Sequence, residues 1–204
     1  MFPLSWDTRF LTFSKNAIRG FFASKIRISS KKKCKIVSRG ITMTHSVNVF
    51  NTEINYQAPV IAHETIEIHA SKKTIMSILS NILEWPTWRQ DISNVQLLSS
   101  DNNVSTGTDF EWKSNGLKYN SQIHTCTTSL FGWTGKTIGA YAVHNWKLTT
   151  NKSRTTVEVS ESLEGLSIKL MKRKMQSELP LLLRKDLHDL KIQCEKIFAE
   201  VKND

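Results

Sequence analysis

A histidine and a glutamate are the residues of this chain best suited to acid–base chemistry. His144 and Glu161 lie in two successive runs of alternating apolar residues, which the turn at 151–153 separates. Pairing the runs as a hairpin sets His144 opposite Glu161, or diagonal to it if the register slips by two. An imidazole beside a carboxylate can act as a general base next to a ligand carbonyl, with Tyr119 as a third candidate. Alternatively, the pair is structural and does no chemistry, which is the commoner case.

The segments that carry these residues predict an antiparallel sheet. A first strand is expected within residues 60–68, where Val60, Ala62, Ile66 and Ile68 are apolar. Six further strands are predicted at 92–99, 107–113, 117–127, 130–138, 139–149 and 154–162. Turns of Gly, Asn and Ser separate several of them, and short sequential connections imply antiparallel pairing.

Helices are predicted on both sides of this run of strands. Ser71 is positioned to cap a helix after the first strand, and a second short helix begins near residue 83, where Pro86 suits a first turn. The last segment carries apolar residues at steps of three and four from Leu170 or Met171 to Val201. That spacing predicts one long amphipathic helix, which Pro180 should kink.

Several short segments, taken in order, resemble one superfamily. They are 63–70, 84–88, 107–112, 133–135, Gly139, 144–146, 156–162, and Leu187, Leu190 and Lys191. Together they are similar to the SRPBCC (START-like, helix-grip) superfamily, of the polyketide cyclase/dehydrase and lipid-transport type. The resemblance implies an α+β fold: a curved antiparallel sheet of about seven strands wrapped around a long carboxy-terminal helix, with two short helices after the first strand. It also implies an internal cavity for an apolar small molecule.

A sheet curled around a helix buries one face, so alternate residues of each strand point inward. The inward residues are mostly apolar and aromatic, as expected for a small-molecule pocket. The residues predicted to contact a ligand are Trp85, Trp88, Phe110, Trp112, Tyr119, Ser121, Ile123, Trp133, His144, Trp146, Glu161, Met171 and Met175. The tryptophans could also serve base stacking, but a role in the core or cavity wall fits their apolar positions better.

Most of the net charge of +10 lies in the first part of the chain. Residues 1–43 contain ten Lys or Arg, one acid and six serines, which leaves 18 basic and 17 acidic residues for 44–204. A nearly neutral domain argues against general nucleic-acid binding. The basic segment has the composition of a mitochondrial or plastid transit peptide; a basic tail, or an extension upstream of a true start at Met43, are the alternatives. Without a transit peptide, a cytoplasmic protein is expected.

We therefore predict an extension over 1–43, a linker over 44–57 and a ligand-binding domain over 58–204. Three distant cysteines match no metal or disulfide spacing, and the common nucleotide, dinucleotide and hydrolase motifs are missing from the sequence, so no metal or cofactor is expected.

Three functions stay open: a carrier of a lipid-like or polycyclic molecule, a cyclase or dehydratase acting on a polyketide-like substrate, and a mitochondrial quinone or lipid chaperone. A basic cluster of Lys169, Lys172, Arg173 and Lys174 is either a solvated helix face or a contact with lipid headgroups.

Overall fold

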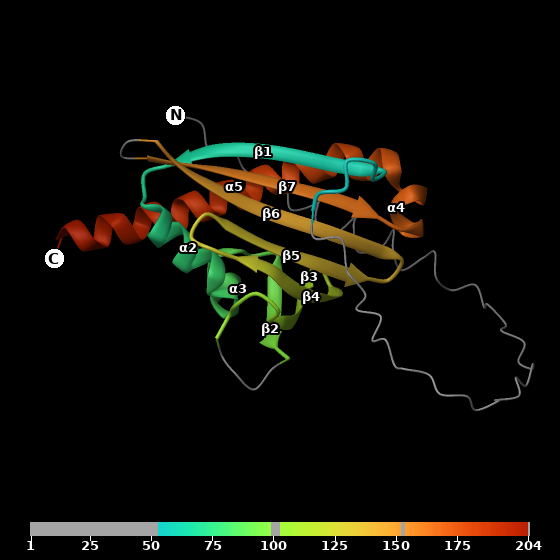
Figure 1. The fold of residues 1–204 in the computed structure, drawn as a ribbon, viewed down its shortest axis with the longest axis horizontal. Coiled ribbons are helices and arrows are strands. Elements are labelled where there is room, and N and C mark those ends of the chain that lie inside the picture. Colours follow the sequence, from blue (N-terminus) through green and yellow to red (C-terminus); the bar gives the residue numbers. More distant parts are fainter. Residues whose placement is uncertain (1–52, 99–102, 152–153, 204) are drawn as a thin grey trace, which may run out of the picture. The chain divides into compact units, whose positions relative to one another are not determined.

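The computed structural model describes residues 53–98, 103–151 and 154–203. Seven strands form one antiparallel sheet in the order β1-β7-β6-β5-β4-β3-β2, and helix α5 lies along one face of it (Figure 1). The elements are β1 (Val60–Ile68), α2 (Lys72–Ser80), η1 (Ile82–Glu84), α3 (Trp85–Trp88), β2 (Ile92–Leu97), β3 (Asp109–Ser114), β4 (Leu117–Cys126), β5 (Leu130–Thr137), β6 (Ala140–Asn151), β7 (Arg154–Glu164), α4 (Leu166–Leu170) and α5 (Lys172–Asn203). The predicted α+β helix-grip architecture is confirmed.

Local sequence accounts for the short helices at the edge of the sheet. The Ser71 side chain accepts a hydrogen bond from the Thr74 amide, which caps the start of α2 as predicted. Ile75, Ile78 and Leu79 then turn toward the core at helical spacing. Pro86 lies in the first turn of α3, where the missing amide breaks no intrahelical bond. This corner places Trp85 against the sheet.

Helix α5 packs against the sheet through one apolar stripe. Leu179, Leu183, Leu187, Leu190 and Cys194 are all buried, at the steps of three and four that the sequence predicted. The hairpin of β6 and β7 has the predicted register, with His144 opposite Glu161. The sheet and α5 therefore enclose the core between them.

The carboxy-terminal helix differs from the prediction at its start. It is divided into α4 and α5, with Met171 between them in a non-helical conformation. Leu170 is 68% exposed, so the expectation that the apolar stripe begins there is wrong. Pro180 lies inside α5, which continues through it as one element, and the predicted kink stays a prediction.

The predicted extension over 1–43 and most of the linker over 44–57 lie outside the described residues. Near the end of that linker, the Asn55 amide donates to Ser162 Oγ at 3.1 Å, which ties this segment to β7. The domain boundaries and the transit peptide stay predictions. In the described part of the chain, no helix has both the length and the apolar character needed to span a membrane.

Candidate functional site

Aromatic side chains fill the space between the sheet and the short helices, and Trp85 lies at their centre. Its ring centroid is 5.0 Å from that of Trp133, 5.8 Å from Phe110, 6.1 Å from Trp112 and 6.5 Å from Phe131. The Trp85 indole N–H donates to the Leu79 carbonyl at 3.0 Å, so its polar atom is satisfied within the short helices. Trp85 thus occupies the centre of this aromatic cluster.

His144 lies between two tryptophans on the inner face of the sheet. Its ring stacks on Trp133 at 4.3 Å and on Trp146 at 5.7 Å between centroids. His144 Nδ1 lies 3.0 Å from Glu161 Oε2, and both side chains are largely buried. Because an ionised carboxylate only accepts hydrogen bonds, this contact puts a proton on Nδ1. The opposite nitrogen, Nε2, is buried without a partner in the described structure.

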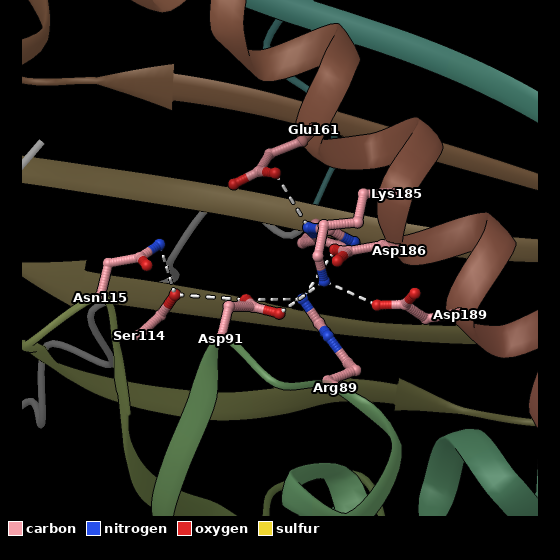
Figure 2. A network of polar contacts seen from close by, with 9 residues as sticks. Arg89, Asp91, Ser114, Asn115, Glu161, Lys185, Asp186 and Asp189 are labelled. Atoms are coloured by element: carbon pink, nitrogen blue, oxygen red, sulfur yellow. Dashed lines mark hydrogen bonds and ion pairs between the residues drawn. The ribbon is translucent and has the colours of Figure 1, made fainter. Parts of the chain in front are cut away.

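A network of charged groups joins the connection between α3 and β2 to α5 (Figure 2). Arg89 Nη2 lies 2.7 Å from Asp186 Oδ2 and 3.7 Å from Asp91 Oδ2. Lys185 Nζ contacts Asp91 at 3.1 Å and Asp189 at 2.6 Å. Arg89 and Asp186 are both buried, so each desolvated charge has its counterion at hydrogen-bond distance.

Burial shifts the pKa values of the ionisable side chains in and around this network. Desolvation raises the pKa of Asp186 to about 6, against the opposing effect of the positive charge on Arg89. Burial likewise tends to raise the pKa of Asp91, but Arg89 and Lys185 outweigh it and lower that pKa. Burial, with smaller effects from Glu161 and Asp91, raises the pKa of Tyr119 to about 12. Tyr119 therefore keeps its phenolic proton at neutral pH and can donate it in a hydrogen bond.

The sequence matches no protein-family model and no curated protein. Several solved structures share the fold at low identity. A START superfamily protein from Mycobacterium smegmatis aligns with a TM-score of 0.56 and 16% identity, over 67% of this chain and 98% of that one. The di-domain ARO/CYC StfQ from the steffimycin biosynthetic pathway gives 0.59 and 9%, over 69% and 52%. The hypothetical protein jhp0584 from Helicobacter pylori gives 0.62 and 12%, over 76% and 99%.

This chain has the START-like, helix-grip fold. The likeness is one of fold, since all three identities are far below the level at which an activity could be transferred.

The helix-grip domain brings most of the predicted site residues to one region. Phe110 and Ile123 are buried on the inner face, and Ser121 Oγ accepts the indole N–H of Trp112 at 2.9 Å. Trp112 also stacks on Tyr119 at 4.8 Å between centroids. Tyr119 and Trp112 are only half-buried, so this part of the inner face lies nearer to solvent.

Three predicted ligand contacts lie at the margin of this region. Trp88 is half-buried, and its indole nitrogen is buried without a partner in the described part of the chain. Met175 packs against the core from the first turns of α5, and Met171 lies at the junction of α4 and α5. At 1.5 Å per helical residue, Met175 is roughly 16 Å along the axis from Asp186. The two methionines therefore lie far from the network of charged side chains around Asp186.

The sequence reasoning missed Arg89, Asp91, Lys185, Asp186 and Asp189. One signal was present: Asp186 interrupts the apolar stripe of the last helix between Leu183 and Leu187, where an acid is expected only if it has a partner. The partner could not be found from spacing, because Arg89 lies 97 positions earlier in the chain. Over the ranges that the structure describes, no group of three or more His, Cys, Asp or Glu is arranged to hold a metal ion.

Proposed function

We propose that the domain binds an apolar small molecule that carries at least one hydroxyl group, between the inner face of the sheet and α5. The observation that carries this proposal is His144 Nε2, a buried nitrogen with no hydrogen-bond partner in the described structure, on a ring held by Glu161 and flanked by Trp133 and Trp146. A buried polar atom without a partner is costly, and a ligand hydroxyl would satisfy it.

The inner face also offers a row of small side chains next to this nitrogen. Ser121, Gly135 and Ala142 are directly paired across β4, β5 and β6. A methyl group built on Gly135 would stand 3.5 Å from Ser121 Oγ, so even an alanine would fit there. These small side chains occupy little space beside the half-buried rings of Trp112 and Tyr119. An apolar ligand would lie along this row.

A large ligand would require Trp85 to move. Trp85 belongs to α3, a helix of four residues; its indole N–H donates to the end of α2, and its backbone N–H donates to the Ile82 carbonyl in η1. Such a short helix has little internal stability, so its position depends on packing and on the contact of Arg89 with α5. We expect α3 to be the part that shifts when the site fills.

Extraction of the purified full-length chain tests the carrier function. Native mass spectrometry should detect a copurifying apolar molecule, which solvent extraction releases for identification. The variant His144→Phe keeps a flat ring between the tryptophans but removes the nitrogen, and it should retain at most a tenth of the ligand. The control Tyr56→Phe changes an exposed ring outside the predicted ligand contacts and should retain the native amount. The proposal would be refuted if the purified protein contained no ligand and bound no hydroxylated apolar probe.

A second function, an acid–base enzyme, is favoured by the tautomer that Glu161 imposes. With the proton on Nδ1, Nε2 of a neutral His144 carries a free lone pair, as a general base needs. It would take a proton from a carbon next to a ligand carbonyl and return it to a departing hydroxyl, which leaves as water. The change Glu161→Gln would then lower turnover by about a hundredfold with little effect on binding. Equal turnover in both proteins would leave the carrier function alone.

A further inference from the structure

Three large apolar side chains protrude from one end of the domain. Ile138 is 73% exposed, Leu166 is 70% exposed and Leu170 is 68% exposed. Ile138 lies in the turn between β5 and β6, and the two leucines lie on α4. Exposed leucines are ordinary when single, but a group of them at one end of a domain indicates a contact surface.

Hydrogen bonds hold the turn and the helix together. The amide and the hydroxyl of Ser167 both donate to the Gly139 carbonyl, at 3.1 Å and 2.8 Å. Ile138 therefore sits one residue from the point where its turn meets α4. Leu166 and Leu170 are four residues apart, so they lie on the same face of that helix. We call Ile138, Leu166 and Leu170 the apolar tip.

Exposed cations surround the apolar tip. Lys169, Lys172 and Arg173 are exposed and make no ion pair within the described residues, while Lys174 lies 3.7 Å from Glu178. Farther along α5 the pattern changes, because three of the four Lys and Arg residues between positions 184 and 196 have acidic partners. These pairs are Arg184 with Glu64, Lys185 with Asp189, and Lys191 with Glu195. Uncompensated positive charge on α4 and α5 is thus concentrated beside the tip.

A surface pocket opens next to the same cations. It has a volume of about 360 Å³ and lies between residues 55–59 and residues 164–169, with Leu166 and Lys169 on its rim. Glu164 also lines it and is an acidic residue at this end of the domain. Leu166 of the apolar tip and the free cation Lys169 therefore also line this pocket.

We infer that this end of the domain docks on the surface of an anionic lipid bilayer. Protruding apolar side chains enter the boundary between headgroups and acyl chains, while flanking Lys and Arg attract anionic headgroups. The three unpaired cations match that charge, and the three apolar side chains supply the insertion. The docking would bring the α4 end of the domain to the bilayer, and it stands whether or not the interior binds a ligand.

Site-specific fluorescence on the full-length chain tests the docking. A nitrobenzoxadiazole group is attached to a cysteine at position 170 (Leu170→Cys), or at position 192 (Ile192→Cys) as control. Cys34 and Cys126 are replaced by Ser. Cys194 stays unlabelled because it is buried, and because burial, more than any other cause, raises its thiol pKa to about 12. Ile192 is also exposed, at 55%, but lies about 30 Å along α5 from Lys172.

With vesicles of phosphatidylcholine and phosphatidylserine, we expect the emission from position 170 to rise and shift to the blue, and that from position 192 to stay unchanged. Because residues 1–43 are also basic, they could bind vesicles on their own. That case is recognisable: the protein would sediment with vesicles while position 170 stays silent. This result, or no binding at all, would overturn the inference.

Substitutions separate the two contributions to docking. Leu166→Ser with Leu170→Ser should lower vesicle partitioning by about tenfold or more, whereas Ile192→Ser should not. Lys172→Gln with Arg173→Gln should lower it by about fivefold for each charge, on anionic vesicles only. The matched control is Lys113→Gln with Lys196→Gln, two exposed lysines elsewhere. If the leucine changes instead abolish a dimer in solution, the surface binds a second copy and the inference fails.

Discussion

Arg89 Nη2 and Asp186 Oδ2 are 2.7 Å apart in the interior, and this contact joins the end of α3 to the middle of α5. The guanidinium carbon of Arg89, Cζ, lies 5.7 Å from the centroid of the Trp85 ring. One side chain therefore both neutralises the buried carboxylate and packs against the central tryptophan. The position of α3, and with it the volume available between sheet and helix, depends on this pair.

Replacing Arg89 by methionine should destabilise the domain strongly. The change keeps most of the aliphatic volume but leaves Asp186 buried and close to Asp91 without its main counterion. Loss of one partner of a buried ion pair costs about 3–5 kcal/mol of the free energy of unfolding. Urea unfolding followed by tryptophan fluorescence measures the loss.

Two further variants serve as controls for that measurement. The double variant Arg89→Met with Asp186→Leu removes both charges and should recover more than half of the loss. Arg154→Met breaks the exposed pair of Arg154 with Glu67, at 3.1 Å, and should cost less than about 1 kcal/mol. If Arg89→Met costs no more than Arg154→Met, the buried pair does not fix α3.

The raised pKa of Asp186 predicts a particular pH dependence. Its pKa is about 6 in the folded protein against 3.8 for the free side chain, so the folded state binds this proton more tightly. Stability from this group therefore increases as the pH falls through 6 and is lost as the pH rises. Between pH 7 and pH 5 the native protein should gain about 1 kcal/mol relative to the variant Asp186→Asn, which lacks the titration. Urea unfolding of both proteins at the two pH values measures the difference; an equal pH dependence would contradict it.

The order of elements and the hairpin register could be read from the sequence because both depend on local patterns. Alternating apolar residues set the faces of β6 and β7, and the turn between them fixed His144 opposite Glu161. The Arg89–Asp186 pair could not be read, because it depends on how α3 and α5 approach each other over 97 positions. The break at Met171 was also missed, since Leu170 continues the apolar spacing of the helix although its side chain faces solvent.

Shortening Trp85 should create space inside the domain. Trp85 is 1% exposed and lies within 6.5 Å of four aromatic rings, so Trp85→Ala should lower the free energy of unfolding by about 3–5 kcal/mol. The vacated volume should also raise the affinity for an apolar fluorescent dye. Trp85→Leu is the alternative if the alanine variant does not fold, and the half-buried Trp88, changed to alanine, is the control. Dye affinity equal to that of the native protein would show that the surroundings collapse into the space.

Gly165 should be the glycine least tolerant of substitution, because it sets the angle between β7 and α4. Its φ of +114° is strained for any residue with a side chain, and a methyl group built there would collide with the Gly139 carbonyl oxygen and touch Ala140 Cα at 3.0 Å. That oxygen accepts both hydrogen bonds from Ser167, so the collision falls on the contact between α4 and the β5–β6 turn. Gly165→Ala should therefore cost about 2–5 kcal/mol in the free energy of unfolding. The control Gly135→Ala adds a methyl group with ordinary contacts, the nearest at 3.5 Å, and should cost at most about 1 kcal/mol. Urea unfolding of the two variants measures both values, and equal losses would mean that the backbone around α4 adapts to the added methyl group.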